Sequence, residues 1–161
     1  MKAITVLLLV PALAVAQEES ITAANIPAPI KSAVMARFAG AKIKGGSKET
    51  EDGKTFYEVS LDRAGKNIDV TSTPAGVLTL IESEMSRADL PAAVTTLIDT
   101  KYAKATWQRV EEVREIKNKV EKVSFFEVLL TDAKKESWEL QVAGDGSKFI
   151  NVEKKKAGEP N

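Results

Sequence analysis

Two stretches of this chain repeat one apolar pattern, from Ile26 and again from Leu90, an offset of 64 residues. Ile26-Pro27-Ala28 aligns with Leu90-Pro91-Ala92, and Ile30, Ala33, Val34 and Phe38 align with Val94, Leu97, Ile98 and Tyr102. The spacing i, i+3, i+4, i+8 marks one stripe of an amphipathic helix, and proline is tolerated in a first helical turn. Each stretch therefore predicts a helix that packs one face and ends near an aromatic residue.

Strands are predicted after each helix. Residues 56–61 match residues 125–130, and alternation places Tyr57, Val59 and Leu61 on one face, as it does Phe126, Val128 and Leu130. We expect that face to pack against the helices. Two further strands follow in each copy, at 68–70 and 77–85 and again at 138–142 and 148–152. Segment 106–116 is ambiguous because Trp107, Val110 and Val113 recur every three residues, as in a helix, and only the repeat favours a strand.

The pattern predicts an α+β fold of two tandem repeats, each a helix plus antiparallel strands. Together they would form a sheet with helices on one face and the other face open. The predicted boundaries are residues 26–88 for repeat 1 and 89–153 for repeat 2. A flexible N-terminal segment, residues 17–25, would precede them, and a disordered tail, residues 154–161, would follow.

The first 16 residues are typical of a secretory signal peptide. Lys2 precedes an apolar run over residues 4–13, and the small residues Ala14 and Ala16 occupy the positions that a signal peptidase reads. We expect cleavage after Ala16 and a periplasmic or secreted mature protein. No later segment is apolar enough to span a bilayer, so we expect no membrane insertion after cleavage.

Composition excludes several classes of function. The chain has no histidine and no cysteine, which removes Ser-His-Asp and Cys-His nucleophiles, histidine- or thiolate-based zinc sites and disulfides. With 23 basic and 23 acidic residues, it lacks the basic excess of a nucleic-acid-binding protein. We therefore predict no enzymatic activity, no cofactor and no metal site. The numerous acidic residues are interpreted mostly as a solvated face: Glu49, Glu51, Asp52, Glu82, Glu84, Glu111, Glu112, Glu115, Asp132 and Asp145.

The face away from the helices provides the candidate binding residues. Alternation places Phe56, Glu58 and Ser60 on it in one copy, and Phe125, Glu127 and Leu129 in the other. Exposed aromatic rings contribute large contact areas at interfaces, and the two glutamates would set the polarity around them. Trp107 is a further candidate whose face the pattern leaves undecided. In the alternative interpretation, the aromatic rings only cover sheet surface or form a homodimer contact.

These residues resemble the PepSY-like family, whose members are similar to beta-lactamase inhibitory protein. The resemblance covers residues 26–153 and rests on short motifs: Ile26-Pro27 and Arg87-Ala88-Asp89-Leu90-Pro91, Phe56-Tyr57-Glu58-Val59 and Phe126-Glu127-Val128, and Gly76 and Gly146. It implies tandem PepSY-like repeats and an exported, non-enzymatic role in binding or inhibiting another protein. The inhibitory protein uses disulfides that this chain cannot form, so we do not predict beta-lactamase as the target.

Three functional hypotheses remain. The first is an exported binding or inhibitory module that holds a periplasmic or extracellular protein or peptide on the open sheet face. The second is a structural or chaperone-like envelope protein that captures peptide by strand addition at a sheet edge. The third, and least favoured, is an enzyme that uses carboxylates alone. The sequence does not decide between a monomer and a homodimer.

Overall fold

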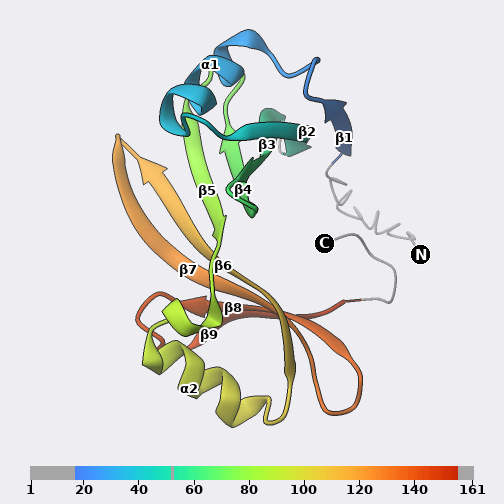
Figure 1. The fold of residues 1–161 in the computed structure, drawn as a ribbon, viewed down its shortest axis with the longest axis vertical. Helices are drawn as coiled ribbons and strands as arrows, with labels where there is room; N and C mark the ends of the chain where they lie inside the picture. Colours follow the sequence, from blue (N-terminus) through green and yellow to red (C-terminus); the bar gives the residue numbers. More distant parts are fainter. Residues whose placement is uncertain (1–16, 52, 156–161) are drawn as a thin grey trace, which may run out of the picture.

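The computed structural model describes residues 17–51 and 53–155, so the predicted signal peptide, residues 1–16, lies outside the described residues (Figure 1). In the described part of the chain, nine antiparallel strands form one sheet in sequential order. Two ten-residue helices, α1 (Ala28–Arg37) and α2 (Ala92–Lys101), and a 3₁₀ turn, η1 (Arg87–Asp89), complete the fold. The strands are β1 (Gln17–Thr22), β2 (Lys42–Glu51), β3 (Lys54–Arg63), β4 (Lys66–Ser72), β5 (Leu78–Glu84), β6 (Thr106–Lys117), β7 (Val120–Thr131), β8 (Ser137–Ala143) and β9 (Phe149–Lys154).

The predicted α+β fold of balanced tandem repeats is wrong. Most of the described residues belong to one continuous sheet, and the two short helices account for only a small part of the fold. The sheet does not break near residue 88, because β5 pairs with β6 from Leu80↔Glu115 to Glu84↔Glu111. Strands β6 and β7 each run for twelve residues, longer than any strand that we predicted. The architecture is therefore a nine-stranded antiparallel meander.

Both helices bury the stripe that the sequence predicts. Pro27 and Pro91 occupy the N-cap positions, and the fully buried side chains are Ile30 and Val34 in α1 and Val94 and Ile98 in α2. Figure 1 shows α1 at the top of the molecule, α2 at the bottom and β5 running between them. Each helix therefore covers a different part of the sheet.

Two apolar clusters form the core, one beneath each helix. The first joins α1 to Val59, Leu61, Val70 and Ile81, with Tyr57 packed against it. The second joins α2 to an equivalent set from the later strands: Val110, Phe126, Val128, Leu130, Leu140 and Val142. The predicted packing face of 57–61 and of 126–130 is thereby confirmed, and so is the strand over 106–116.

Close backbone approaches fix the turns that lie beneath the helices. Gly76 has φ +80°, and a Cβ there would lie 2.6 Å from the Pro29 carbonyl oxygen. Gly146 has φ +71°, and a Cβ there would lie 2.7 Å from the Ala93 carbonyl carbon. Glycine is required at both positions because a side chain would be strained and would collide with helix backbone.

Both predicted boundary segments contain ordered structure. Segment 17–25, which we expected to be flexible, contains β1, paired with β2 from Gln17↔Thr50 to Thr22↔Gly45. The predicted tail begins at residue 154, yet Lys154 belongs to β9 and its Nζ lies 2.6 Å from Glu136 Oε1. Residues 156–161 of that tail lie outside the described residues.

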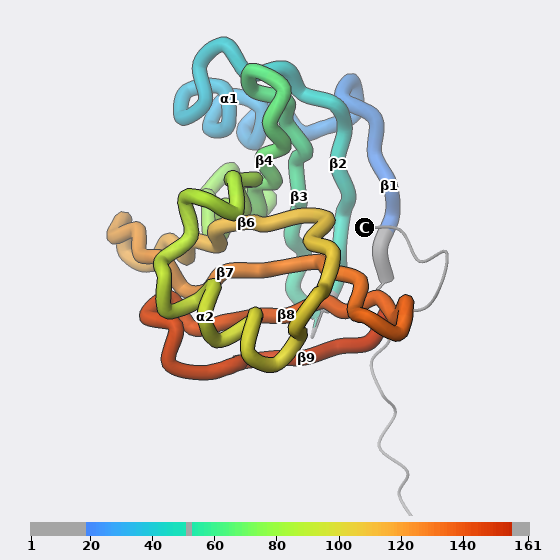
Figure 2. The backbone as a smooth tube through the Cα atoms, turned by 60° about the horizontal axis from the view of Figure 1, so that its bottom comes forward, coloured from blue at the N-terminus to red at the C-terminus, as the bar shows by residue number. Residues whose placement is uncertain are grey.

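The β6–β7 hairpin connects the two parts of the molecule. Its tip turns at Asn118 and Lys119, both with positive φ, and Ile116 packs against the first apolar cluster. Arg37 of α1 places Nη2 3.2 Å from Glu121 Oε2. Figure 2 shows β2 and β3 running crosswise to β6–β9, so the sheet is strongly twisted between its two ends. Neither helix of the described chain is long or apolar enough to cross a membrane.

Candidate functional site

Acidic side chains from four neighbouring strands gather on the open face of the sheet. Glu58 lies on β3, Asp69 on β4, Glu82 on β5 and Glu111 on β6, each at a position that alternates with the helix-facing residues. They line a pocket of about 430 Å³, which we call the carboxylate pocket. Its lining residues are Lys44, Glu58, Ser60, Asn67, Asp69, Glu82, Arg109 and Glu111.

The strand register places like charges directly opposite one another. Asp69 pairs with Glu82 across β4 and β5, Glu84 with Glu111 across β5 and β6, and Glu111 with Glu127 across β6 and β7. Like charges at directly opposed positions destabilise an antiparallel pair. The centre of the open face therefore concentrates negative charge at a cost in stability.

Arg109 offsets part of this charge from within the pocket. Its Nε lies 3.1 Å from Glu111 Oε2, and its Nη2 lies 3.8 Å from Glu127 Oε1. Glu127 is held on its other side by Gln141, whose Nε2 donates to Glu127 Oε2 at 3.2 Å. One guanidinium thus bridges two carboxylates that face each other across β6 and β7.

Two carboxylate oxygens in the pocket are buried without a hydrogen-bond donor. The Glu111 side chain is only 2% exposed, and its Oε1 has no hydrogen-bond partner among the described residues. The buried Oδ1 of Asp69 also has no hydrogen-bond partner there. Asp69 Oδ2 accepts a hydrogen bond from Asn67, whose own Oδ1 accepts one from Lys44 Nζ at 2.6 Å. A buried acceptor without a donor costs about 1–3 kcal/mol.

Burial changes the proton affinity of these acids. Loss of water contact, which has the largest effect, and the charges of Glu127, Glu111, Glu58 and Asp69 together raise the pKa of Glu82 to about 8. Carboxylates that are taken out of water and surrounded by like charges bind protons more tightly. Glu82 therefore retains a proton near neutral pH.

Glu111 and Glu127 shift in the same direction. Burial raises the pKa of Glu111 to about 7 even though Arg109 opposes the shift. Burial also raises the pKa of Glu127, with Glu139 adding to the shift and Gln141 opposing it. Glu82 and Glu111 thus exchange protons close to neutrality within the pocket, and Arg109 lies beside Glu111.

The chemistry available to the pocket is recognition of positive charge. Among the described residues, no three acidic side chains are arranged to hold a metal ion. The acids are instead spread over four strands around a cavity large enough for an organic group. A cation with several separated donors matches this arrangement better than a single ion does.

The structure separates the six residues that we predicted as a binding site. Glu58 lines the pocket, and Glu127 adjoins it through Arg109. Phe56 and Phe125 are half-buried on the open face but lie on β3 and β7, which are four strands apart. Leu129 is 5% exposed.

Trp107 lies on the opposite side of the sheet. It packs against the second apolar cluster, with the Arg87 guanidinium carbon 4.2 Å from its ring centroid. The structure therefore places Glu58 in the lining of the carboxylate pocket and Glu127 beside Arg109, and it separates the tryptophan from both.

Sequence reasoning missed the centre of the site. Asp69, Glu82, Arg109 and Glu111 were not candidates, and we interpreted Glu82 and Glu111 as part of a solvated face. Their alternation with apolar residues on β4–β6 was a usable signal. The pairing of β5 with β6, which brings Glu82 and Glu84 beside Glu111, was not predicted.

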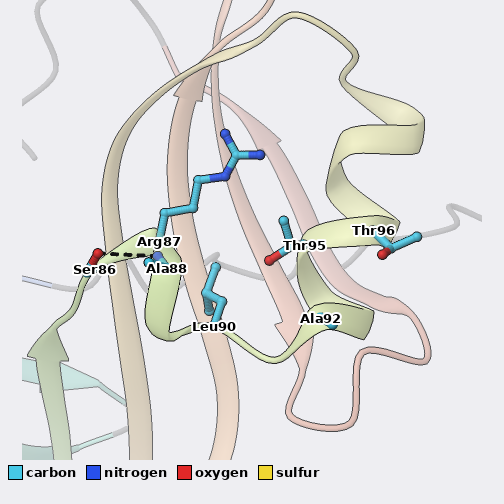
Figure 3. Close-up of a pocket in the computed structure, with 7 residues that line it drawn as sticks. All are labelled: Ser86, Arg87, Ala88, Leu90, Ala92, Thr95 and Thr96. Carbon is cyan, nitrogen blue, oxygen red and sulfur yellow. Dashed lines mark hydrogen bonds between the residues drawn. The ribbon is translucent and has the colours of Figure 1, made fainter.

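A larger hollow of about 650 Å³ lies at the start of α2 (Figure 3). Its one charged lining residue, Arg87, is already engaged, because its Nη2 lies 2.9 and 2.7 Å from the two carboxylate oxygens of Asp99. Ser86 Oγ accepts a hydrogen bond from the Ala88 amide at 3.2 Å. These groups already serve the local structure, so we assign no chemistry to this hollow.

Comparison with known proteins identifies the fold alone. No protein-family model and no curated protein matches the chain. A DUF2874 family protein from Bacteroides uniformis ATCC 8492 matches with a TM-score of 0.62 and 16% identity, over 80% of this chain and 88% of that chain. A protein from Bacteroides eggerthii DSM 20697, proposed to be periplasmic, matches with a TM-score of 0.61 and 13% identity, over 80% of this chain and 88% of that chain. A BLIP-like protein from Bacteroides fragilis NCTC 9343 matches with a TM-score of 0.60 and 17% identity, over 84% of this chain and 91% of that chain. The chain therefore has a fold similar to that of a BLIP-like protein.

Proposed function

We propose that the protein is an exported, non-enzymatic binding module that holds a protein or peptide partner against the open face of its sheet. The observation that carries this proposal is the shape of that face. Val113 lies on it and is fully buried, although both described helices pack on the other side. A twisted sheet encloses a side chain in this way when its face is concave, and concave surfaces are where ligands bind.

The comparisons are consistent with this role. One similar structure is described as BLIP-like and another as a proposed periplasmic protein, which supports an exported binding protein. The predicted leader over residues 1–16 supports the same location. Neither inhibition of an enzyme nor membership of the PepSY-like family is part of the proposal.

Strand addition at an edge is the weaker alternative. The outer strands of the described sheet, β1 and β9, are six residues each, and β9 exposes Glu153 and Lys154. Short, charged edge strands disfavour pairing with another chain. The open face is therefore the better candidate surface.

The test is capture of a partner from periplasmic extract by tagged residues 17–161. We expect a specific protein to be retained by the wild type and lost by the Phe56→Ser/Phe125→Ser variant. The matched control, Met35→Ser/Val77→Ser, changes two exposed apolar side chains, one on α1 and one in the turn before β5, and should retain it. Circular dichroism would confirm that all three proteins are folded.

Equal retention by the wild type and both variants would contradict binding through the open face and favour edge-strand capture. A second outcome would contradict the non-enzymatic role. Turnover of any substrate that disappears in Glu82→Gln, with folding intact, would indicate that the carboxylates perform chemistry.

A further inference from the structure

We propose that the carboxylate pocket is a binding site for a guanidinium group, the cationic head of arginine side chains and of small molecules related to arginine. This inference deepens the proposed function. It rests on that function in one respect, which is that the pocket opens on the same face of the sheet. It assigns a ligand chemistry to pocket residues of which only Glu58 belonged to our sequence-based site.

The first argument is charge. The pocket is lined by four carboxylates, from Glu58, Asp69, Glu82 and Glu111, and by two cations, Lys44 and Arg109. Glu84 and Glu127 add negative charge directly opposite Glu111 on the neighbouring strands. The lining thus has an excess of acid that a bound cation would neutralise.

The second argument is the buried oxygen of Glu111. This side chain is 98% buried, it lines the pocket, and its Oε1 has no hydrogen-bond donor among the described residues. Asp69 Oδ1, also in the lining, lacks a donor in the same way. Buried acceptors in folded proteins are nearly always paired, so two such oxygens in one pocket indicate donors brought by a ligand.

The third argument selects the kind of cation. A metal ion or an ammonium group directs all its contacts from one atom, and no three acids of the described chain converge in that way. A guanidinium spreads five N–H donors around a plane and loses less hydration on burial than an ammonium does. Arg109 already shows the fit, since its guanidinium bridges Glu111 and Glu127.

Binding should be coupled to release of protons. Burial raises the pKa of Glu82 to about 8 and that of Glu111 to about 7, so both acids must ionise to pair with a cation. Affinity should therefore increase as the pH rises from about 6 to about 8.5. The charged groups that face these two acids are Lys44 on β2, Glu58 on β3, Asp69 on β4, Glu84 on β5, Arg109 on β6 and Glu127 on β7.

The experiment is calorimetric titration of the folded mature chain at low ionic strength with three probes. Acetyl-arginine-amide represents an arginine side chain, agmatine represents a free small molecule, and acetyl-citrulline-amide is the neutral isostere. We expect a guanidinium probe to bind at least about tenfold more tightly than the citrulline probe. Binding should also release protons, measured by repeating the titration in buffers of different ionisation enthalpy.

Variants connect the binding to the pocket. Asp69→Asn and Glu111→Gln should each weaken guanidinium binding by about tenfold. Glu112→Gln should not, because Glu112 neighbours Glu111 in sequence but lies on the other face, where it pairs with Arg114. Two pocket variants are used so that misfolding of one, detected by thermal unfolding, leaves the other informative.

The outcomes separate the possible sources. Tighter binding of acetyl-arginine-amide than of agmatine supports an arginine of a partner protein, and the reverse order supports a free small molecule. No preference over citrulline, or equal weakening by Glu112→Gln, would overturn the inference. If no guanidinium binding is found but partner capture still depends on Phe56 and Phe125, the proposed function stands without this inference. The proposed function and the guanidinium site can therefore fail separately.

Discussion

The helix-covered face and the open face of the sheet are built from the same strands, yet the first buries apolar side chains and the second buries carboxylates. On β3, Val59 is fully buried beneath α1 while the preceding residue, Glu58, lines the carboxylate pocket. On β6, Val110 packs beneath α2 while the next residue, Glu111, is buried on the open side. Helices exclude water from one face, and the curvature of the sheet excludes it from part of the other.

This difference teaches where stability and function reside. Apolar burial on the covered face stabilises the fold at about 25 cal/mol per Å². Burial of carboxylates on the open face is unfavourable, because they lose contact with water and Arg109 compensates only part of that loss. A fold selected for stability alone would place apolar residues at those positions. We therefore interpret the acids as functional.

The largest expected effect comes from the covered face. Ile98→Ala removes a fully buried side chain from the second apolar cluster and should cost about 3 kcal/mol of unfolding free energy, measured by urea denaturation. Val120→Ala is the matched control, because Val120 is 56% exposed and its loss should cost less than about 0.5 kcal/mol. Similar costs for the two variants would show that α2 does not stabilise the fold.

Arg109→Gln tests the ion pair between Arg109 and Glu111. Without it, a buried carboxylate loses its partner, and we expect a loss of about 2 kcal/mol near pH 8. The loss should shrink near pH 5, where Glu111 is protonated because its pKa is raised to about 7. Arg63→Gln, at the exposed end of β3, is the control. A loss that is the same at both pH values would contradict the assigned ion pair.

Glu82→Gln should instead stabilise the protein at high pH. An acid with a raised folded pKa favours folding at low pH, and that contribution disappears as the pH rises from about 4.5 to about 8. Glutamine cannot ionise, so the variant should lose less stability over this range. The gain at pH 9 should be on the order of 1 kcal/mol, since water still reaches the side chain.

Urea midpoints at pH 5, 7 and 9 would measure this effect. Glu153→Gln on the exposed part of β9 should leave the pH dependence unchanged. Wild-type stability that increases toward pH 9 would contradict the shifted acids of the pocket.

The smallest effect is expected at the contact between α1 and the hairpin tip. Arg37→Gln breaks the pair with Glu121, which lies on the solvent-exposed surface. Exposed ion pairs contribute little, so the change should stay below about 0.5 kcal/mol and vanish in high salt. A loss above 1 kcal/mol would indicate that the hairpin is held mainly by this pair rather than by Ile116.

Local patterns predicted the covered face well. The 3.6-residue period identified Ile30, Val34, Val94 and Ile98, and alternation identified the packing side of β3 and β7. Trp107 was ambiguous for a physical reason: a bulge between Trp107 and Arg109 inserts one residue, so Trp107 and Val110 share a face despite their odd spacing. A three-residue period in a bulged strand therefore imitates a helix.

The open face could not be predicted in the same way. Glu82 and Glu111 are far apart in the chain, and their proximity depends on pairing between β5 and β6, which no local pattern specifies. Alternation says that a residue points away from the helices but not whether sheet curvature will bury it. Long-range pairing thus determined both the single sheet and the pocket.

The ladder between β5 and β6 joins the parts of the sheet that carry α1 and α2, and the hairpin tip adds a second link through Ile116. Amide protons that β5 and β6 donate to each other can exchange with deuterium only when that connection opens. We expect them to be among the slowest in the protein, exchanging together by global unfolding rather than by separate opening of either end. A ligand in the carboxylate pocket contacts both strands and should slow that exchange further.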